Sequence, residues 1–135
     1  MLDLKFVRDH LPEVEQAMRN RGSEISLADF LLHDGERRRL LTRVEELRHQ
    51  RNTLSQEIGS LMKGGKPEEA QAIRTRVMVI NEDIKVLEVR VEEHEIWMQE
   101  FLLTLPNLPH TSVPIGASSA DNPVVKTWGE APSLD

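Results

Sequence analysis

The chain has 135 residues, no cysteine and a formal net charge of −6, a length that suits one domain. The lack of cysteine excludes disulfides and thiolate metal sites, and is typical of a reducing, cytoplasmic setting. No apolar run approaches the ~18 residues of a membrane span, and the first residues lack a basic region followed by an apolar one, so neither a membrane helix nor a secretory signal is predicted.

Residues 1–22 predict two short helices. Asp3 is placed to cap the first of them, and Pro12 suits the first turn of the second, where a missing N–H costs nothing. Gly22 can end the second helix. Ser26 then resembles the N-terminus of a longer helix, although the usual capping box has Glu or Gln three residues later and this chain has Asp there.

Two strict heptad patterns follow, in which steps of four and three residues alternate. The first consists of Leu40, Val44, Leu47, Arg51, Leu54, Ile58 and Leu61, and the second of Ile73, Val77, Ile80, Ile84, Leu87, Val91, His94, Met98, Phe101 and Leu105. Between them Gly64 and Gly65 break the helix and Pro67 can open the next. Two apolar seams joined by a tight turn predict an antiparallel helical hairpin, roughly 50 Å long at ~1.5 Å per residue.

The one charged side chain in these seams is Arg51. We interpret its alkyl stem as part of the seam, with the guanidinium in water, while direct contact with a ligand is the alternative. Trp97 and Phe101 lie one turn apart near the foot of the arm. They are predicted to pack against residues 1–22, and a stacking platform for bases is the alternative.

The predicted fold is therefore all-α, with an extended C-terminal connector. A helical base spans residues 1–25, an antiparallel coiled-coil arm spans 26–105 with its tip at 63–67, and a Pro-rich hinge and linker spans 106–135. Proline cannot continue a helix, so the prolines that follow Leu105 end the arm. The linker contains one weak strand candidate, "VVKTW", and no core of its own, so a further domain is expected to follow it.

Local sequence predicts no catalytic, cofactor-binding or metal-binding residue. None of the five histidines lies three or four residues from another, and His-Glu-x-x-His is absent. His94 is interpreted as a histidine of the seam or the base. The stretch "GSLMKGGKP" has the wrong spacing for a phosphate loop and has Pro67 where that loop needs Ser or Thr.

The charges are divided unevenly. Residues 37–76 hold ten Lys or Arg against five Glu, a net charge of +5 that leaves −11 for the rest of the chain. A local field attracts partners even where the net charge does not. Two interpretations stay open: a solvated coiled-coil face, or a face that binds the phosphates of a structured RNA, whose bases are poorly accessible in A-form helices.

Four stretches resemble the N-terminal domain of bacterial seryl-tRNA synthetases. They are "MLDLKFVRDH" at the start, "RRRLLTRVEELRHQRNTLSQEIG" on the first long helix, "LPNLPHTSVPIG" after the second, and "DNPVVKTWGEAP" near the end. The resemblance implies a coiled-coil arm that reaches across a synthetase homodimer and grips the long variable arm and elbow of tRNA(Ser) by shape and backbone. It also implies a catalytic module, absent here, that uses ATP and Mg²⁺ to attach serine to tRNA in the cytoplasm.

The resemblance supplies no residue motif for contact with tRNA. From charge and position along the arm we predict Arg43, Arg48, Lys63, Lys66, Arg74 and Arg76. Three further arginines, 37 to 39, lie nearer the foot and are expected to pair with the acidic second helix. The segment alone is expected to be monomeric. The alternatives are a structural or adaptor coiled coil without an RNA role, and a free-standing paralogue that kept the arm and lost the enzyme.

Overall fold

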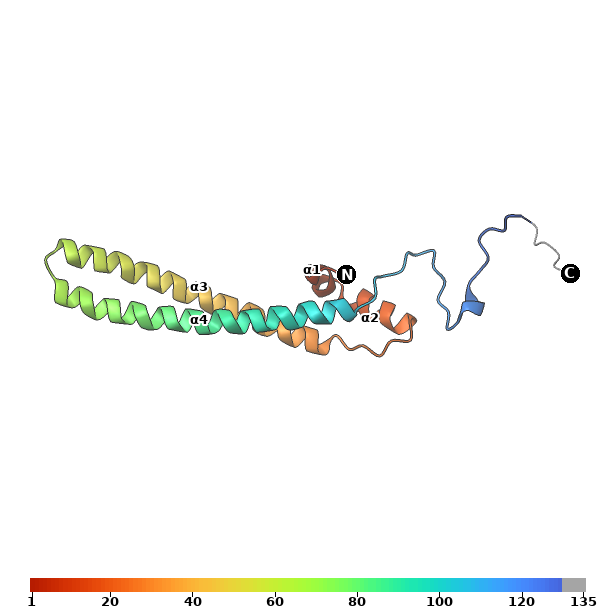
Figure 1. Cartoon of the computed structure of the whole chain (residues 1–135), viewed down its shortest axis with the longest axis horizontal. Helices are drawn as coiled ribbons and strands as arrows, with labels where there is room; N and C mark the ends of the chain where they lie inside the picture. Colours follow the sequence, from red (N-terminus) through yellow and green to blue (C-terminus); the bar gives the residue numbers. More distant parts are fainter. Residues whose placement is uncertain (130–135) are drawn as a thin grey trace. The chain divides into compact units, whose positions relative to one another are not determined.

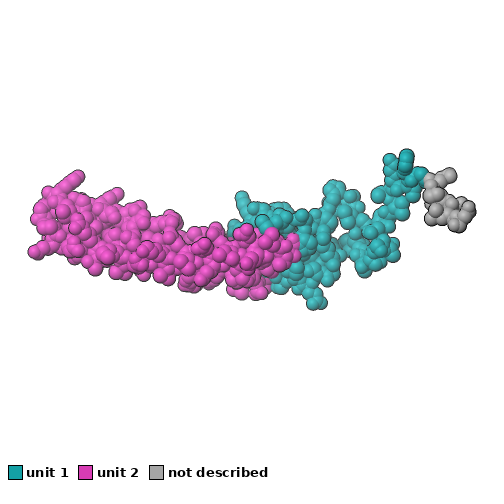
Figure 2. All heavy atoms as spheres, viewed as in Figure 1, with its two compact units in different colours: residues 1–27, 106–135 teal, residues 28–105 magenta. Residues whose placement is uncertain are grey.

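The computed structural model describes residues 1–129. Its helices are α1 (Leu4–Asp9), α2 (Leu11–Asn20), α3 (Ala28–Lys63), α4 (Pro67–Thr104) and a short 3-10 helix, η1 (Ser119–Asp121) (Figure 1). The predicted all-α fold with a long two-helix hairpin is confirmed. The chain divides into two units, one of residues 1–27 and 106–135 and the other of residues 28–105 (Figure 2). None of the helices in the described range combines the length and the apolar character needed to cross a membrane.

The ends of the two short helices follow the sequence signals. The Asp3 carboxylate accepts hydrogen bonds from the backbone N–H groups of Lys5 and Phe6 at 2.9 and 3.1 Å, which caps α1 as predicted. At the end of α2, Gly22 has a φ of 68° and the N–H of Ser23 donates to the carbonyl of Met18 at 3.0 Å. This is a Schellman termination, for which glycine is favoured because it has no Cβ.

The proline-containing segment after α4 lies against α2. The Arg21 guanidinium donates to the carbonyl oxygen of Asn107 at 2.7 Å. A shallow hollow between the two segments is lined by Pro12, Glu13, Gln16, Ala17, Asn20, Leu108 and Pro109. The first residues of the predicted hinge are therefore tied to the short helices.

The predicted strand is wrong. Residues 124–128 form no strand, and Val124, Val125 and Trp128 are almost fully exposed. A strand needs a neighbour that accepts and donates its backbone hydrogen bonds, and the structure has no other strand over residues 1–129. The preceding segment is held by Asp121, whose carboxylate accepts hydrogen bonds from the N–H groups of Ala117 and Ser118 at 2.8 and 2.9 Å.

The hairpin turn has the predicted form. α3 ends at Lys63, Gly65 has a φ of 72°, and the N–H of Lys66 donates to the carbonyl of Leu61 at 2.9 Å. Pro67 is then the first residue of α4. A Schellman end followed directly by a proline start reverses the chain within three residues, so α3 and α4 run antiparallel (Figure 1).

The start of α3 lies close to the predicted one. The helix begins at Ala28, two residues after Ser26, and Asp29 lies in its first turn. Helix ends are commonly assigned with a difference of one or two residues, so Ser26 remains close to the first turn. The acidic side chain is still well placed, because the first turn of a helix favours negative charge.

The hairpin core is the predicted seam. Every seam position on both helices is buried or half-buried. Val44, Leu47 and Ile84 form a buried cluster, with Ile80 and Leu87 packed against it. From residue 51 to the end of α3 the seam positions are only half-buried. On α3, packing is therefore tighter away from the turn, whereas on α4 Ala70 and Ile73 are buried close to it.

Aromatic rings stack at the end of the hairpin opposite the turn. Phe30 of α3 lies 5.9 Å from Phe101 of α4, measured between ring centroids, and Phe101 lies 5.2 Å from Trp97. Trp97 in turn stacks on His33 at 3.8 Å. The two aromatic residues of α4 thus pack on residues of α3, and their predicted packing against residues 1–22 stays a prediction.

Candidate nucleic-acid interface

Charge divides the hairpin along its length. The outer part, residues 47–80 around the turn, has six Lys or Arg against three acidic residues. The inner part, residues 28–46 and 81–105, has six against twelve. Fields are screened within about 8–10 Å at physiological salt, far less than the length of the hairpin, so the two parts act on a partner separately. A polyanion would meet a net positive surface at the outer part only.

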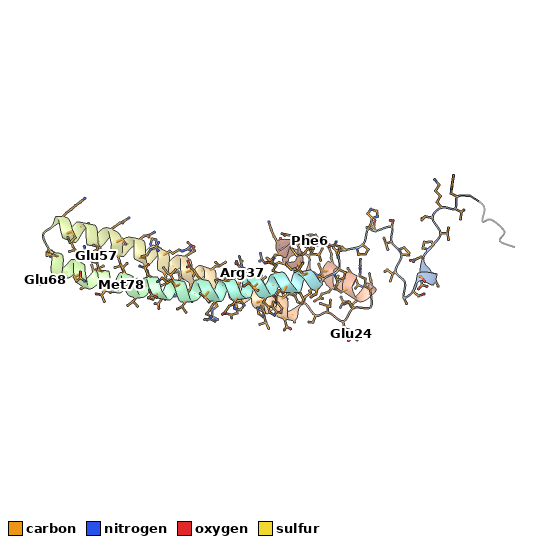
Figure 3. All side chains as sticks on the ribbon, viewed as in Figure 1. Phe6, Glu24, Arg37, Glu57, Glu68 and Met78 are labelled. Carbon is orange, nitrogen blue, oxygen red and sulfur yellow. The ribbon has the colours of Figure 1, made fainter. Side chains whose placement is uncertain are left out.

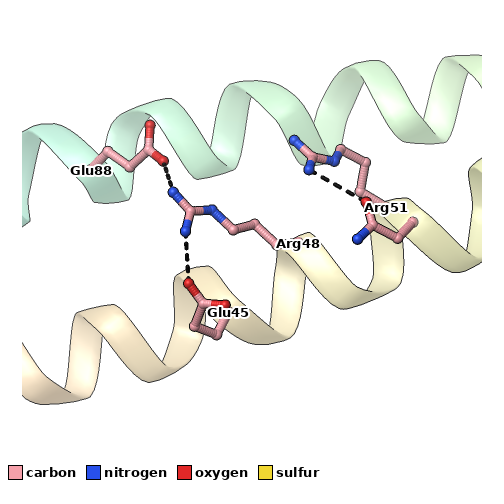
Figure 4. A network of polar contacts seen from close by, with 5 residues as sticks. Glu45, Arg48, Arg51 and Glu88 are labelled. Atoms are coloured by element: carbon pink, nitrogen blue, oxygen red, sulfur yellow. Dashed lines mark hydrogen bonds and ion pairs between the residues drawn. The ribbon is translucent and has the colours of Figure 1, made fainter.

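Arg43 and Arg48, the predicted sites nearest the middle, are already bound to carboxylates. The Arg43 guanidinium contacts Glu46 at 2.9 Å. Arg48 contacts Glu45 of its own helix at 2.7 Å and Glu88 of α4 at 2.8 Å (Figure 4). Hydrogen bonds to these two carboxylates raise the pKa of Arg48. A phosphate would have to displace two carboxylates from Arg48, and Arg43 lies in the net negative inner part, so these two arginines are the weaker candidates.

The predicted sites near the turn are more accessible. Lys66 contacts Glu69 at 3.0 Å, and the Arg74 guanidinium donates to the neutral amide oxygen of Gln71 at 3.5 Å. Lys63 and Arg76 form no ion pair within residues 1–129. Exposed ion pairs contribute only about 0–1 kcal/mol, so a phosphate can replace such a partner at little cost. Figure 3 shows side chains extending outward along this part of the hairpin, where Glu57, Glu68 and Met78 are labelled.

Arg51 lies half-buried at its seam position, which agrees with the interpretation that its alkyl stem is part of the seam. Its guanidinium donates to the side-chain oxygen of Asn52 at 3.4 Å, and within the described residues it forms no ion pair (Figure 4). It lines a shallow groove between α3 and α4 together with Arg48, Met78, Val79, Glu82 and Glu88. The carboxylates that line this groove would repel a phosphate, so the groove is a poor site for one.

The three consecutive arginines behave differently from one another. Arg37 reaches across to α4 and contacts Glu95 at 2.6 Å, as expected. The same expectation is wrong for the next two, because Arg38 contacts Asp34 at 3.3 Å and Arg39 contacts Glu36 at 3.5 Å, both on α3. Successive residues on a helix point about 100° apart, so only one of three neighbours can face the partner helix.

A pair of histidines was not found from the sequence. The Nδ1 atoms of His33 and His94 lie 3.0 Å apart. Burial lowers the pKa of His33, and the neighbouring His94 lowers it further. The heptad pattern could have indicated this pair. His33 lies seven residues before Leu40 and so continues the first seam toward the end of the hairpin opposite the turn. Separation of 61 residues in the chain hid the pair from a search for local spacing.

Similarity to known proteins identifies the chain's family. The profile of a protein family described as the seryl-tRNA synthetase N-terminal domain matches residues 1–109. The chain belongs to this family. The serine–tRNA ligase of Syntrophobacter fumaroxidans is 44% identical over 140 residues, which cover 100% of this chain and 31% of that protein. That of Desulfitobacterium hafniense (strain DSM 10664 / DCB-2) is 43% identical over 135 residues, 100% of this chain and 32% of the relative.

A solved structure agrees with these relatives. The crystal structure of seryl-tRNA synthetase from Pyrococcus horikoshii complexed with ATP has a TM-score of 0.82 and 34% sequence identity to this chain. The match covers 96% of this chain and 29% of the solved one. The chain thus spans about a third of the length of the relatives that it matches.

Proposed function

We propose that this chain is the tRNA-binding arm of a serine–tRNA ligase. The observation that carries the proposal is a two-helix hairpin with a net positive outer part, in a chain that belongs to the seryl-tRNA synthetase N-terminal domain family. In the longer protein a catalytic module would attach serine to tRNA(Ser) with ATP and Mg²⁺. That protein would act as a cytoplasmic homodimer, joined through the catalytic module.

The chemistry of the outer part suits contact with the RNA backbone. Its six cations are Arg and Lys, which bind phosphate oxygens, and the two tryptophans, Trp97 and Trp128, lie outside it. Without Phe, Tyr or Trp rings for stacking, the outer part is poorly suited to base-by-base readout of single strands. A long hairpin with cations near one end instead binds phosphates at positions set by the fold of the RNA. It would therefore recognise the shape made by the elbow and the long variable arm. The residues we propose for these contacts are Lys63, Arg74, Arg76 and Lys66, with Arg43 and Arg48 as secondary sites.

The test is discrimination between tRNA shapes. Binding of the chain to a tRNA with a long variable arm is compared with binding to a tRNA with a short one, at the same salt concentration. We expect tighter binding to the long-armed tRNA, and a further loss when Arg74→Glu reverses one of the accessible charges. Equal binding to both tRNAs would contradict recognition by shape, and no binding to either would favour an adaptor coiled coil.

A further inference from the structure

The end of the hairpin opposite the turn carries a cluster that lies outside the proposed tRNA contacts. His33 of α3 and His94 of α4 face each other through their Nδ1 atoms at 3.0 Å, with the two rings inclined at 70°. The ring of His33 also lies nearly parallel to Trp97, at an interplanar angle of 8° and a centroid distance of 3.8 Å. His33 therefore links two residues of α4 at once.

The contact between the two histidines limits how many protons they can hold. A hydrogen bond between two imidazole nitrogens needs one N–H donor and one lone pair. If both rings were protonated, both Nδ1 atoms would carry hydrogen, and two cations would face each other at 3.0 Å. The contact can therefore exist with both rings neutral or with one ring charged, and not with two imidazolium ions.

The surroundings favour the neutral form of His33. Burial lowers its pKa most, His94 lowers it further, and the Asp29 carboxylate one turn earlier on α3 raises it. Of the other charged groups near the pair, Arg90 and Glu93 of α4 have no ion pair among the described residues, whereas four are in ion pairs. They are Arg37 with Glu95 across the helices, and Asp34 with Arg38 on α3.

We propose that the His33–His94 pair is a proton-operated latch between α3 and α4, closed while at most one ring is protonated and open when both are. Because the pKa of His33 is lower in the folded chain than the ordinary value of about 6.5, the latch contributes fully above that pH. Its contribution is lost as the pH falls through the lower, folded value. The outer seam has no histidine, so acid loosens the inner end of the hairpin selectively.

Trp97 provides a direct reporter of this latch. The chain has only one other tryptophan, Trp128, which is almost fully exposed, so Trp128→Phe leaves Trp97 as the single fluorophore without disturbing a core. An imidazolium quenches indole emission more strongly than a neutral imidazole does. Between about pH 8 and about pH 5 we expect the Trp97 emission and the thermal midpoint of the hairpin to fall together, centred below the ordinary histidine pKa.

Substitutions separate this latch from general acid effects. In the Trp128→Phe chain, His94→Gln should remove most of the pH dependence of the thermal midpoint, whereas the matched control His49→Gln, an exposed histidine of the same helix as His33, should leave it unchanged. In the His94→Gln variant the His33 titration, followed by NMR of its ring protons, should move to higher pH, because a like charge has been removed.

Two results would overturn the proposal. One is a thermal midpoint that depends on pH equally with and without His94. The other is an NMR titration of His33 in the unsubstituted chain at the ordinary histidine value, a measurement that decides the matter even if a variant fails to fold. Neither result bears on tRNA binding, so the latch and the proposed function can fail independently.

Discussion

The outer and inner parts of one hairpin, built on the same heptad rule, differ in charge and in packing. Residues 47–80 carry a net positive charge and, from residue 51 of α3 onward, a half-buried seam. The inner part carries a net negative charge, the buried residues Val44 and Ile84, and the stacked rings of its far end. The comparison indicates that the two parts of the hairpin have different roles. The inner part holds the stacked rings and most of the buried seam, whereas the outer part, whose seam is half-buried on α3, presents cations.

The largest expected effect comes from truncating the seam in each part. Ile84→Ala should lower the free energy of unfolding by about 2–5 kcal/mol, because Ile84 of the inner part is buried within the central cluster. Ile58→Ala removes a half-buried side chain of the outer seam and should cost only about 1–2 kcal/mol. Urea denaturation followed by far-UV circular dichroism compares the two. Equal losses would mean that the outer seam is as stabilising as the inner one.

A smaller effect is expected at the turn that closes the outer part. Gly65 has a φ of 72°, and a β-branched residue there should destabilise the hairpin by about 1–2 kcal/mol, as in Gly65→Val. Gly59 is helical with open space around its missing Cβ, so Gly59→Ala should stabilise the hairpin by about 0.5–1 kcal/mol. Thermal melts of the two variants should therefore shift in opposite directions. A stable Gly65→Val hairpin would show that the turn does not depend on the left-handed conformation.

The smallest effect on stability is expected where the two parts meet. Arg48→Gln removes an arginine that bridges Glu45 and Glu88, but these side chains are about half exposed, so the free energy of unfolding should change by less than about 1 kcal/mol. Lys63→Gln, which breaks no ion pair within residues 1–129, should not change it at all. For tRNA binding the order should reverse, with Lys63→Gln weakening it more. Parallel effects on folding and binding would contradict the separation of roles.

Much of the hairpin followed from its sequence, because its signals are local. The heptads, the glycine pair and Pro67 indicated the seam, the turn and the antiparallel order. Side-chain contacts that depend on how the two helices pack against each other were harder to predict. Arg38 and Arg39 found partners on their own helix, and His33 met His94 through the register of two helices rather than through spacing along one.

The sequence was enough to predict which region carries the candidate site, but not which of its cations are the stronger candidates for binding phosphate. Charge counting along the chain located the basic outer part, and the six predicted residues lie in or next to it. It could not tell which cations were already neutralised, because the carboxylate that meets Arg48 from α4 lies forty residues away. The strand predicted at "VVKTW" failed for a related reason, since local β-propensity does not supply a pairing partner.

The most direct test of the account is the salt dependence of tRNA binding in two matched triple variants. Lys63→Gln/Arg74→Gln/Arg76→Gln removes three cations from the outer part, and Arg37→Gln/Arg38→Gln/Arg39→Gln removes three from the inner part. If the outer part binds phosphates, the first should reduce the slope of log affinity against log salt by about two to three units, and the second should leave it nearly unchanged. Equal reductions in both variants, or none in the first, would contradict the central claim.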